Sequence, residues 1–321
     1  HFDPDIIHIH NLHGYYLDIR VLFEFLKKYN KPIVWTLHDC WAFTGHCAYF
    51  TFANCDKWKT GCGNCPRLKQ ETRSLFFDAT AYSWYRMKRA FNDFKENLII
   101  ASVSPWVMER AKLSPILADK KHVVVLNGLD TDVFHHYPNN HIRAELGIKN
   151  EEKVIFHATP NFTDNPNHIK GGRFVIELAK RMPHVRFVIA GSIYGDPPRV
   201  PSNVLLLGAV TDSHKLAMLY SMADITLLTS KKETFSMVCA ESLSCGTPVV
   251  GFQAGAPEQI SLPEYSSFVE YGNVDLLSTE TSKMISKVFD HREIAKKAKE
   301  KYSKEVMSQN YIRLYKSILT Q

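Results

Sequence analysis

The stretch at positions 233–248, ETFSMVCAESLSCGTP, constrains the fold more than any other part of this 321-residue chain. The apolar run Ile225–Leu228 precedes it and Val249–Gly251 follows it. The pattern therefore predicts a strand, a helix that begins near Ser236, and a second strand. Glu233 would then lie at the carboxyl end of a strand, the edge at which open α/β sheets bind their ligands.

Two kinds of hydrogen-bonding group come together in this stretch. The backbone N–H groups of Phe235, Ser236 and Met237 lie in the first turn of the predicted helix, where they and the helix dipole favour a phosphate. Glu233 and Glu241 offer carboxylate oxygens, which suit the vicinal hydroxyls of a sugar or a ribose. A nucleotide sugar has all of these parts and would use both kinds of group. The alternative is an amphipathic surface helix whose two glutamates are solvated.

The spacing Glu-x7-Glu from Glu233 to Glu241, with Gly-Thr-Pro-Val-Val at 246–250, resembles the donor-site motif of retaining family 4 glycosyltransferases with the GT-B fold. The resemblance implies an α/β protein with two Rossmann-like domains that face a cleft, the second holding most of the nucleotide. It also implies transfer of a sugar from a nucleotide diphosphate sugar to an acceptor hydroxyl with retention. The expected role is the synthesis of cell-surface polysaccharide or glycolipid, with a sugar or a lipid-linked molecule as acceptor.

The polar run Pro138-Asn139-Asn140 is the predicted boundary between the two domains. Residues 1–137 would form the acceptor-side domain and residues 138–304 the nucleotide-sugar domain, with a last helix at 305–321 packing back on the first. Relatives usually have a first strand and a Gly-rich turn upstream of the short strand at His1–His10. The expectation is therefore a first domain that lacks its N-terminal segment.

Two further positions of the second domain match the resemblance. Lys170 follows a predicted strand, and in relatives a Lys-Gly here, preceded by an arginine, neutralises the diphosphate leaving group. This loop offers Asn161 and His168 where that arginine is expected, and Arg173 comes afterwards, so the identity of the second cation stays open. Residues Gly208–Val210 resemble the stretch whose backbone reads the nucleotide base.

In the first domain, the predicted strand Ile33–Leu37 delivers His38 to the ligand-binding edge. An imidazole there titrates near neutral pH, and in similar enzymes such a histidine contacts the transferred sugar. The alternative is a structural histidine bonded to a backbone carbonyl. His8 and His10 share one face of an earlier strand, where we expect satisfied polar residues rather than a metal site.

The segment 38–67 has few aliphatic residues and contains five cysteines. Cys62-Gly-Asn-Cys65 is a CxxC pattern whose central residues permit the tight turn that points two sulfur atoms at one ion. Cys47 and Cys55 would complete a structural zinc site, which would tie down the loop without a role in the chemistry. Disulfides or simply buried thiols are the alternatives.

The composition of the chain indicates which kinds of partner the protein can bind and where in the cell we expect it. A formal charge of +6 permits attraction to anionic ligands or to a membrane surface, whereas the interspersed acids argue against nucleic acid. No run of eighteen apolar residues is present, so no transmembrane helix is expected. The expected location is the cytoplasm, with peripheral contact at the inner face of the membrane as a further expectation. No Asp-x-Asp motif lies where a divalent metal would assist, so no cofactor is expected for catalysis.

Two other functions fit the same residues. One is a non-catalytic nucleotide-sugar-binding module, truncated or degenerate, which holds the nucleotide and transfers nothing. The other is a nucleotide-sugar epimerase of the same fold. Assaying sugar transfer from a panel of nucleotide sugars separates these alternatives from a transferase.

Overall fold

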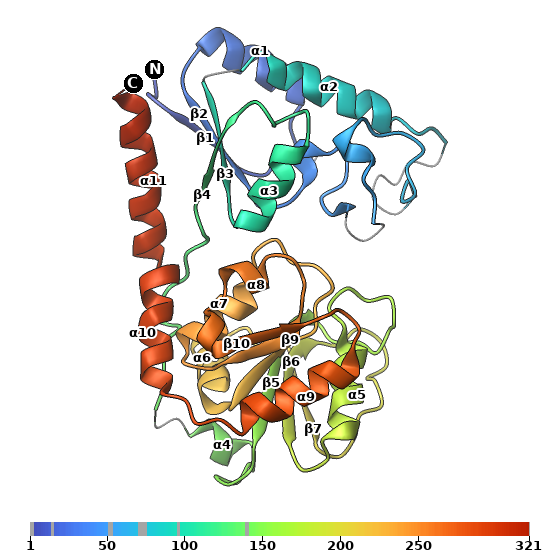
Figure 1. Cartoon of the computed structure of the whole chain (residues 1–321), viewed down its shortest axis with the longest axis vertical. Coiled ribbons are helices and arrows are strands. Elements are labelled where there is room, and N and C mark those ends of the chain that lie inside the picture. Colours follow the sequence, from blue (N-terminus) through green and yellow to red (C-terminus); the bar gives the residue numbers. More distant parts are fainter. Residues whose placement is uncertain are drawn as a thin grey trace. The chain divides into compact units, whose positions relative to one another are not determined.

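The computed structural model describes residues 3–13, 16–50, 54–69, 76–94, 97–138 and 141–320. The chain divides into two compact units (Figure 1). Unit 1 comprises His1–Leu126 with Gln309–Gln321, and unit 2 comprises Asn127–Ser308. Each unit is built around its own parallel β-sheet, which confirms the predicted α/β class.

Unit 1 contains a four-stranded sheet in the order β1-β2-β3-β4, in which every strand is parallel to its neighbour. The strands are β1 (Ile7–Ile9), β2 (Ile33–Leu37), β3 (Leu98–Ser102) and β4 (Lys121–Val124). The helices between them are α1 (Ile19–Tyr29), α2 (Thr80–Asn92) and α3 (Pro105–Leu113). β2 and β3 are buried along their whole length, as expected for central strands of a parallel sheet.

The C-terminal helix α11 (Lys304–Leu319) supplies part of the core of unit 1. Leu314 packs in one cluster with Val34 of β2 and with Ile99 and Ala101 of β3. The hydroxyl group of Tyr315 also forms a hydrogen bond with Nδ1 of His8, at 2.6 Å. Unit 1 is therefore assembled from both ends of the chain.

Unit 2 contains a six-stranded parallel sheet in the order β10-β9-β8-β5-β6-β7. Its strands are β5 (Val154–Asn161), β6 (Arg186–Ser192), β7 (Val204–Gly208), β8 (Ile225–Leu228), β9 (Val249–Phe252) and β10 (Ser266–Val269). The strand order reverses between β5 and β8, because the chain adds β6 and β7 on one side and then returns to the other. Such a reversal is the topological switch point at which open α/β sheets bind ligands.

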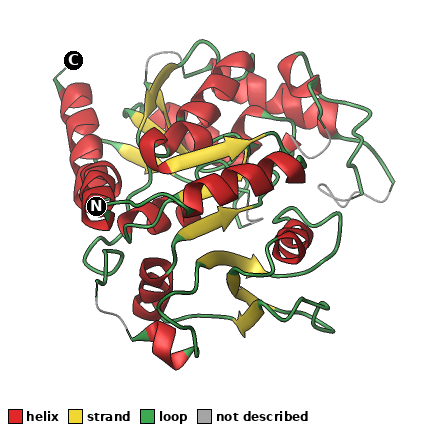
Figure 2. Ribbon diagram, turned by 60° about the horizontal axis from the view of Figure 1, so that its bottom comes forward, coloured by secondary structure: helices red, strands yellow, loops and turns green. Residues whose placement is uncertain are grey.

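Helices cover both faces of the sheet of unit 2 (Figure 2, helices red and strands yellow). They are α4 (Ile142–Glu145), α5 (Gly172–Arg181), α6 (Ser213–Met222), α7 (Met237–Ser244), α8 (Pro257–Ile260), α9 (Val274–Ile285) and α10 (His291–Tyr302). Alternate residues of β5 join different cores, since Ile155 packs with α5 and α9 whereas Val154 and Phe156 pack with α6. The sheet is thus packed on both faces.

The boundary between the units lies between residues 126 and 127, whereas the sequence predicts it between residues 137 and 138. Leu129 donates its backbone N–H to the carbonyl oxygen of Tyr302 at 2.8 Å, and Phe134 and Tyr137 pack against the core of unit 2. These contacts place residues 127–137 in unit 2, because packing outweighs the polar character of the Pro138 turn. Asn139 and Asn140, the rest of the predicted breaker, lie outside the described residues.

Candidate functional site

Lys170 and Glu233 meet at the switch point of unit 2. Lys170 follows β5 and Glu233 follows β8, and these two strands are neighbours in the sheet. The ammonium Nζ of Lys170 lies 2.6 Å from Oε1 of Glu233. The side chains are only 27% and 16% exposed, so the ion pair is partly shielded from water. A cation and a carboxylate predicted from separate loops are therefore direct partners.

Backbone contacts between the two loops explain why the ion pair forms. The hydroxyl group of Thr229 donates to the carbonyl oxygen of Lys170 at 2.8 Å, and the N–H of Lys231 donates to Ile169 at 2.8 Å. Gly171 has a φ of 68°, and a Cβ atom at this position would overlap the carbonyl oxygen of Thr229. A glycine is therefore required after Lys170 for the two loops to approach this closely.

Glu233 is held from the opposite side by the loop that follows β9. Its backbone N–H donates to the carbonyl oxygen of Ala254 at 2.9 Å, and it forms an isolated parallel bridge with Gly255. The carboxylate of Glu258 accepts hydrogen bonds from the N–H groups of Ala254 and Gly255, at 3.1 and 2.8 Å. Glu258 thus holds the loop after β9 in place, and this loop in turn positions Glu233. The sequence alone did not indicate this role of Glu258.

The helix α7 begins immediately after Ser236, as predicted. Ser236 is the N-cap in a left-handed conformation with a φ of 80°, and its hydroxyl group accepts a hydrogen bond from the N–H of Cys239 at 3.3 Å. Phe235 is buried, whereas Met237 is 38% exposed. Non-glycine residues rarely adopt this backbone conformation, so the turn that starts α7 is held in place by the buried side chains around it.

Glu241 is not solvated, although it lies on a helix. Its Oε2 accepts a hydrogen bond from the hydroxyl group of Tyr220 on α6 at 2.9 Å. Burial raises the pKa of Glu241, and burial together with the Glu241 carboxylate raises the pKa of Tyr220 well above its usual range. The alternative interpretation, a surface helix with two solvated glutamates, therefore does not describe this site.

Several polar atoms near Lys170 have no hydrogen-bond partner among the described residues. They are Nε2 of His157, Oδ1 of Asn161 and Nδ1 of His168. Lys170 contributes to lowering the pKa of both histidines, after burial as the main cause, and the pKa of His157 falls to about 4. His157 also bonds the carbonyl oxygen of Leu227 through Nδ1 at 2.9 Å. The sequence analysis singled out Asn161 and His168 but not His157. A histidine within an otherwise apolar predicted strand was the sign that could have identified it.

Gly208, the predicted base-reading residue, ends β7 on the outer edge of the same sheet. It has a φ of 72°, and no heavy atom lies within 4 Å of the position that a Cβ would take. Its backbone is thus accessible at the carboxyl end of its strand. β6 lies between β7 and β5, so Gly208 is separated from Lys170 by one strand.

In unit 1, His38 follows β2 and pairs with a histidine from the adjacent strand. Its Nε2 lies 2.9 Å from Nδ1 of His10, which follows β1. Burial and the neighbouring His10 lower the pKa of His38, against the opposing effect of Asp39. His8 is satisfied as expected, because its two ring nitrogens bond Tyr315 and Thr36 at 2.6 and 2.7 Å.

Comparison with known proteins gives the class of unit 2. Residues 165–287 match the family described as "Glycosyl transferases group 1", and this range contains Lys170, Gly208, Glu233 and Glu241. Residues 165–287 are a glycosyltransferase group 1 domain.

The rest of the chain resembles glycosyltransferases as well. It is 24% identical over 327 residues to the "Putative colanic acid biosynthesis glycosyl transferase WcaC" of Escherichia coli K12, covering 98% of this chain and 77% of that protein. The solved sucrose-phosphate synthase of Thermosynechococcus elongatus is 17% identical with a TM-score of 0.68, over 98% of this chain and 74% of the other. HepE of Anabaena, solved with UDP, is 18% identical with a TM-score of 0.66, over 98% and 79%. The chain has the GT-B fold of these glycosyltransferases.

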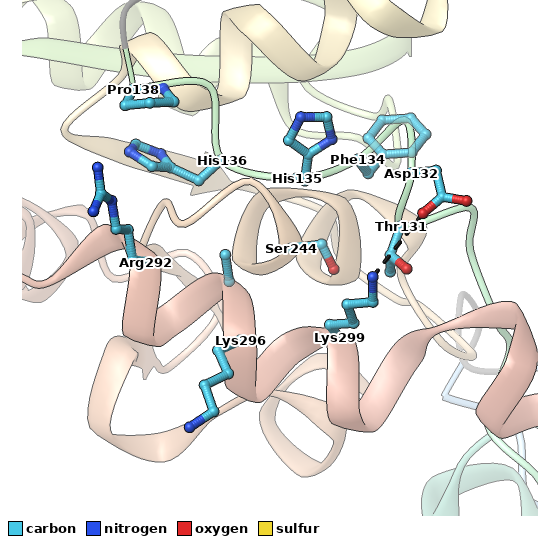
Figure 3. Close-up of a pocket in the computed structure, with 11 residues that line it drawn as sticks. Thr131, Asp132, Phe134, His135, His136, Pro138, Ser244, Arg292, Lys296 and Lys299 are labelled. Atoms are coloured by element: carbon cyan, nitrogen blue, oxygen red, sulfur yellow. Dashed lines mark ion pairs between the residues drawn. The ribbon is translucent and has the colours of Figure 1, made fainter.

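The glycosyltransferase group 1 domain borders a cavity of about 540 Å³ that includes none of the predicted site residues (Figure 3). Its walls come from residues 131–138, from α10, and from Ser244 at the end of α7. Arg292, Lys296 and Lys299 make it basic, although Lys299 lies 4.0 Å from the carboxylate of Asp132 (Figure 3). This cavity is separate from the predicted site, which lies at the strand ends.

The four predicted zinc ligands line one small pocket in unit 1. Within the described ranges, no three His, Cys, Asp or Glu side chains form a group that would hold a metal ion. The described helices also include none that is long and apolar enough to cross a membrane.

Proposed function

We propose that this protein transfers a sugar from a nucleotide diphosphate sugar to an acceptor hydroxyl with retention of the anomeric configuration. The observation that carries the proposal is the Lys170–Glu233 ion pair at the switch point of a glycosyltransferase group 1 domain. A diphosphate needs a cation, a sugar needs acceptor oxygens, and the two side chains provide both within one site.

Each residue of the site has a proposed role in binding the nucleotide sugar. Lys170 and the backbone N–H groups that lead into α7, at Phe235, Ser236 and Met237, contact the diphosphate. Glu233 accepts hydrogen bonds from hydroxyl groups of the transferred sugar. Glu241, oriented by Tyr220, accepts them from the ribose. The backbone at Gly208 contacts the base, as the resemblance implies.

The Lys170–Glu233 contact would change when the nucleotide sugar binds. Without ligand the two side chains satisfy one another at 2.6 Å. A phosphate oxygen would take over part of the hydrogen bonding of Lys170, and a sugar hydroxyl would donate to the released carboxylate. The pair therefore keeps both groups oriented before the ligand arrives, which is the form of preorganisation that electrostatic catalysis requires.

The chemical step breaks the bond between the anomeric carbon and the oxygen of the terminal phosphate. The acceptor oxygen forms its bond to that carbon on the same face, and its proton leaves with the phosphate or to water. Negative charge then develops on the leaving diphosphate, where Lys170 stabilises it. His38 is the proposed contact of unit 1 to the transferred sugar, and no catalytic metal is proposed.

The substrate class follows from the relatives. HepE was solved with UDP and, in other crystals, with UDP-glucose, so uridine diphosphate sugars come first among the candidates. WcaC is named for colanic acid biosynthesis, which supports an acceptor in cell-surface polysaccharide or glycolipid synthesis. We place the reaction in the cytoplasm, at the inner face of the membrane if the acceptor is lipid-linked.

A panel of nucleotide sugars tests the proposal. The full chain is incubated with UDP-, GDP- and ADP-sugars and with sugar or lipid-linked acceptors, and release of nucleoside diphosphate is followed together with the glycosylated product. NMR of the product anomer, compared with that of the nucleotide sugar, tests retention. Tight binding of a nucleotide sugar without turnover would support the alternative of a non-catalytic binding module. A change in the configuration of the sugar without transfer would indicate an epimerase. Absence of binding to every member would overturn the proposal.

A further inference from the structure

The described residues between β2 and α2 form neither a β-strand nor an α-helix. They include the 3₁₀ turns η1 (Trp41–Phe43) and η3 (Lys57–Lys59). Within this segment, the side chain of Trp58 is buried, and its ring centroid lies 5.5 Å from that of Phe43 and 4.6 Å from that of Phe50. A long loop with few ladder hydrogen bonds needs another source of order.

Four cysteines of this segment line one pocket. Cys47, Cys55, Cys62 and Cys65 surround a cavity of about 30 Å³, with His46 also in its wall. Positions 47 and 65 are eighteen residues apart in the sequence, yet the fold brings all four cysteines to the wall of one pocket.

The turn from Cys62 to Cys65 joins two cysteines that line the same pocket. Gly63 and Asn64 have φ values of 132° and 46°, which reverse the chain between the two cysteines. Lys57 donates from Nζ to the carbonyl oxygens of both central residues, at 2.9 and 2.5 Å. The turn is therefore fixed by a side chain that does not compete with the sulfur atoms.

Backbone N–H groups point at the sulfur atoms of this turn. The N–H of Gly45 hydrogen-bonds to Cys62, and the N–H of Arg67, two residues beyond Cys65, hydrogen-bonds to Cys65. A Cβ at Gly45 would lie 2.8 Å from the sulfur of Cys62, so only glycine permits this approach. N–H donors at sulfur stabilise a thiolate, which is the form that binds metal.

We propose that Cys47, Cys55, Cys62 and Cys65 bind one Zn²⁺ ion as a structural site of unit 1. Four thiolates in tetrahedral arrangement are the typical ligand set of structural zinc. The described side chains are not yet arranged as ligands, so binding closes the thiols on the ion, and each loses its proton to solvent. The ion would tie residues 47–65 to the start of α2, because Asp78 accepts from the N–H of Cys65 at 2.6 Å and from that of Thr80 at 2.8 Å. This site is independent of the proposed sugar transfer.

Elemental analysis of the full chain, purified without chelator, tests the proposal. The expected result is about one zinc per chain with negligible iron, because iron on the same sulfur set would colour the protein. The double variant Cys62→Ser/Cys65→Ser should lose the metal. Cys40→Ala is the matched control, since Cys40 is a buried thiol of the same segment that does not line the pocket, and it should retain the metal. Wild-type protein without stoichiometric zinc would overturn the proposal.

Two measurements on the wild type keep the proposal testable if the double variant does not fold. Replacement of zinc by Co²⁺ should give the visible bands and sulfur-to-metal charge transfer of a tetrahedral thiolate site. Alkylation under non-reducing, denaturing conditions with chelator should label all four cysteines. A disulfide within the group, or cobalt spectra without thiolate character, would contradict the zinc site. Removing the metal should raise hydrogen exchange in residues 44–69 and leave nucleotide affinity unchanged, which separates this inference from the proposed function.

Discussion

Each unit pairs two polar side chains at the ends of neighbouring strands, but the pairs differ in charge. In unit 2, Lys170 and Glu233 follow β5 and β8 and form an ion pair at 2.6 Å. In unit 1, His10 and His38 follow β1 and β2 and meet at 2.9 Å as two imidazoles. The ion pair joins a cation to a carboxylate, whereas the imidazole pair joins two rings by a hydrogen bond. The same strand-end position therefore carries an ion pair in one sheet and a hydrogen-bonded ring pair in the other.

The largest expected effect comes from removing the cation of the ion pair. Lys170→Met should lower turnover roughly 10²- to 10³-fold, by analogy with the loss of one group that stabilises transition-state charge. It should also raise the dissociation constant of the nucleoside diphosphate more than that of the bare nucleoside. Steady-state kinetics and calorimetry measure both quantities.

Lys215→Met is the matched control for this variant, because Lys215 is exposed on α6 and takes no part in the site. It should behave as the wild type does. The double variant Lys170→Met/Glu233→Gln removes the unpaired carboxylate and shows whether the loss comes from the missing cation. An unchanged ratio of the two dissociation constants in Lys170→Met would exclude Lys170 from the diphosphate site.

The two glutamates should separate binding of the nucleotide from binding of the sugar. Glu241→Ala should weaken nucleotide affinity by about 1–3 kcal/mol, since a buried charged hydrogen bond to the ribose is lost. Glu233→Ala should reduce affinity for the whole nucleotide sugar, or its turnover, more than affinity for the free nucleotide. Tyr220→Phe removes only the hydroxyl that orients Glu241 and should give a smaller loss than Glu241→Ala. Equal, negligible changes in both glutamate variants would show that neither contacts the ligand.

Disrupting the imidazole pair should affect turnover alone. His38→Ala should lower turnover up to about tenfold, the value of one neutral hydrogen bond, and leave nucleoside diphosphate affinity intact because unit 2 supplies that site. His10→Ala tests whether His38 acts alone or as a pair with His10, since it removes the 2.9 Å partner and keeps His38. A large loss of nucleotide affinity in His38→Ala would contradict the division of roles between the units.

The smallest expected effect is on stability at acidic pH. Burial, followed by the charges of His10 and His38, lowers the pKa of His8 to about 4 from an ordinary value of 6.5. The unfolded chain therefore binds more protons than the folded chain between these values, and stability should fall as the pH decreases from about 6.5 toward 4. His8→Gln should reduce this loss by on the order of 1 kcal/mol, given that His8 is only half-buried. Urea unfolding of both proteins at several pH values measures the difference, and identical pH slopes would rule out His8 as the cause.

The sequence was informative wherever function required a local pattern. The α7 start at Ser236, the Lys170 loop and the two strands around Glu233 were all predictable from apolar runs and their breaks. Tyr220, His157 and His10 were not, because each acts through a partner that is remote in sequence, such as Glu241, which lies 21 positions after Tyr220. Contacts between residues that are far apart in the sequence leave no periodic pattern of apolar and polar residues. The boundary between the units differs from the predicted one for the same reason, since residues 127–137 look like a linker in the sequence and pack as part of unit 2.

The way unit 1 takes residues from both ends of the chain has a consequence for biosynthesis. His8 bonds a tyrosine that is 307 positions further along, and all of unit 2 is translated between the two. At 5–20 residues per second, Tyr315 leaves the ribosome roughly 15–60 s after His8. During that interval Val34 and Ile99 lack the covering that Leu314 provides. The nascent first unit must therefore wait, incomplete and exposed to chaperones, while unit 2 already folds.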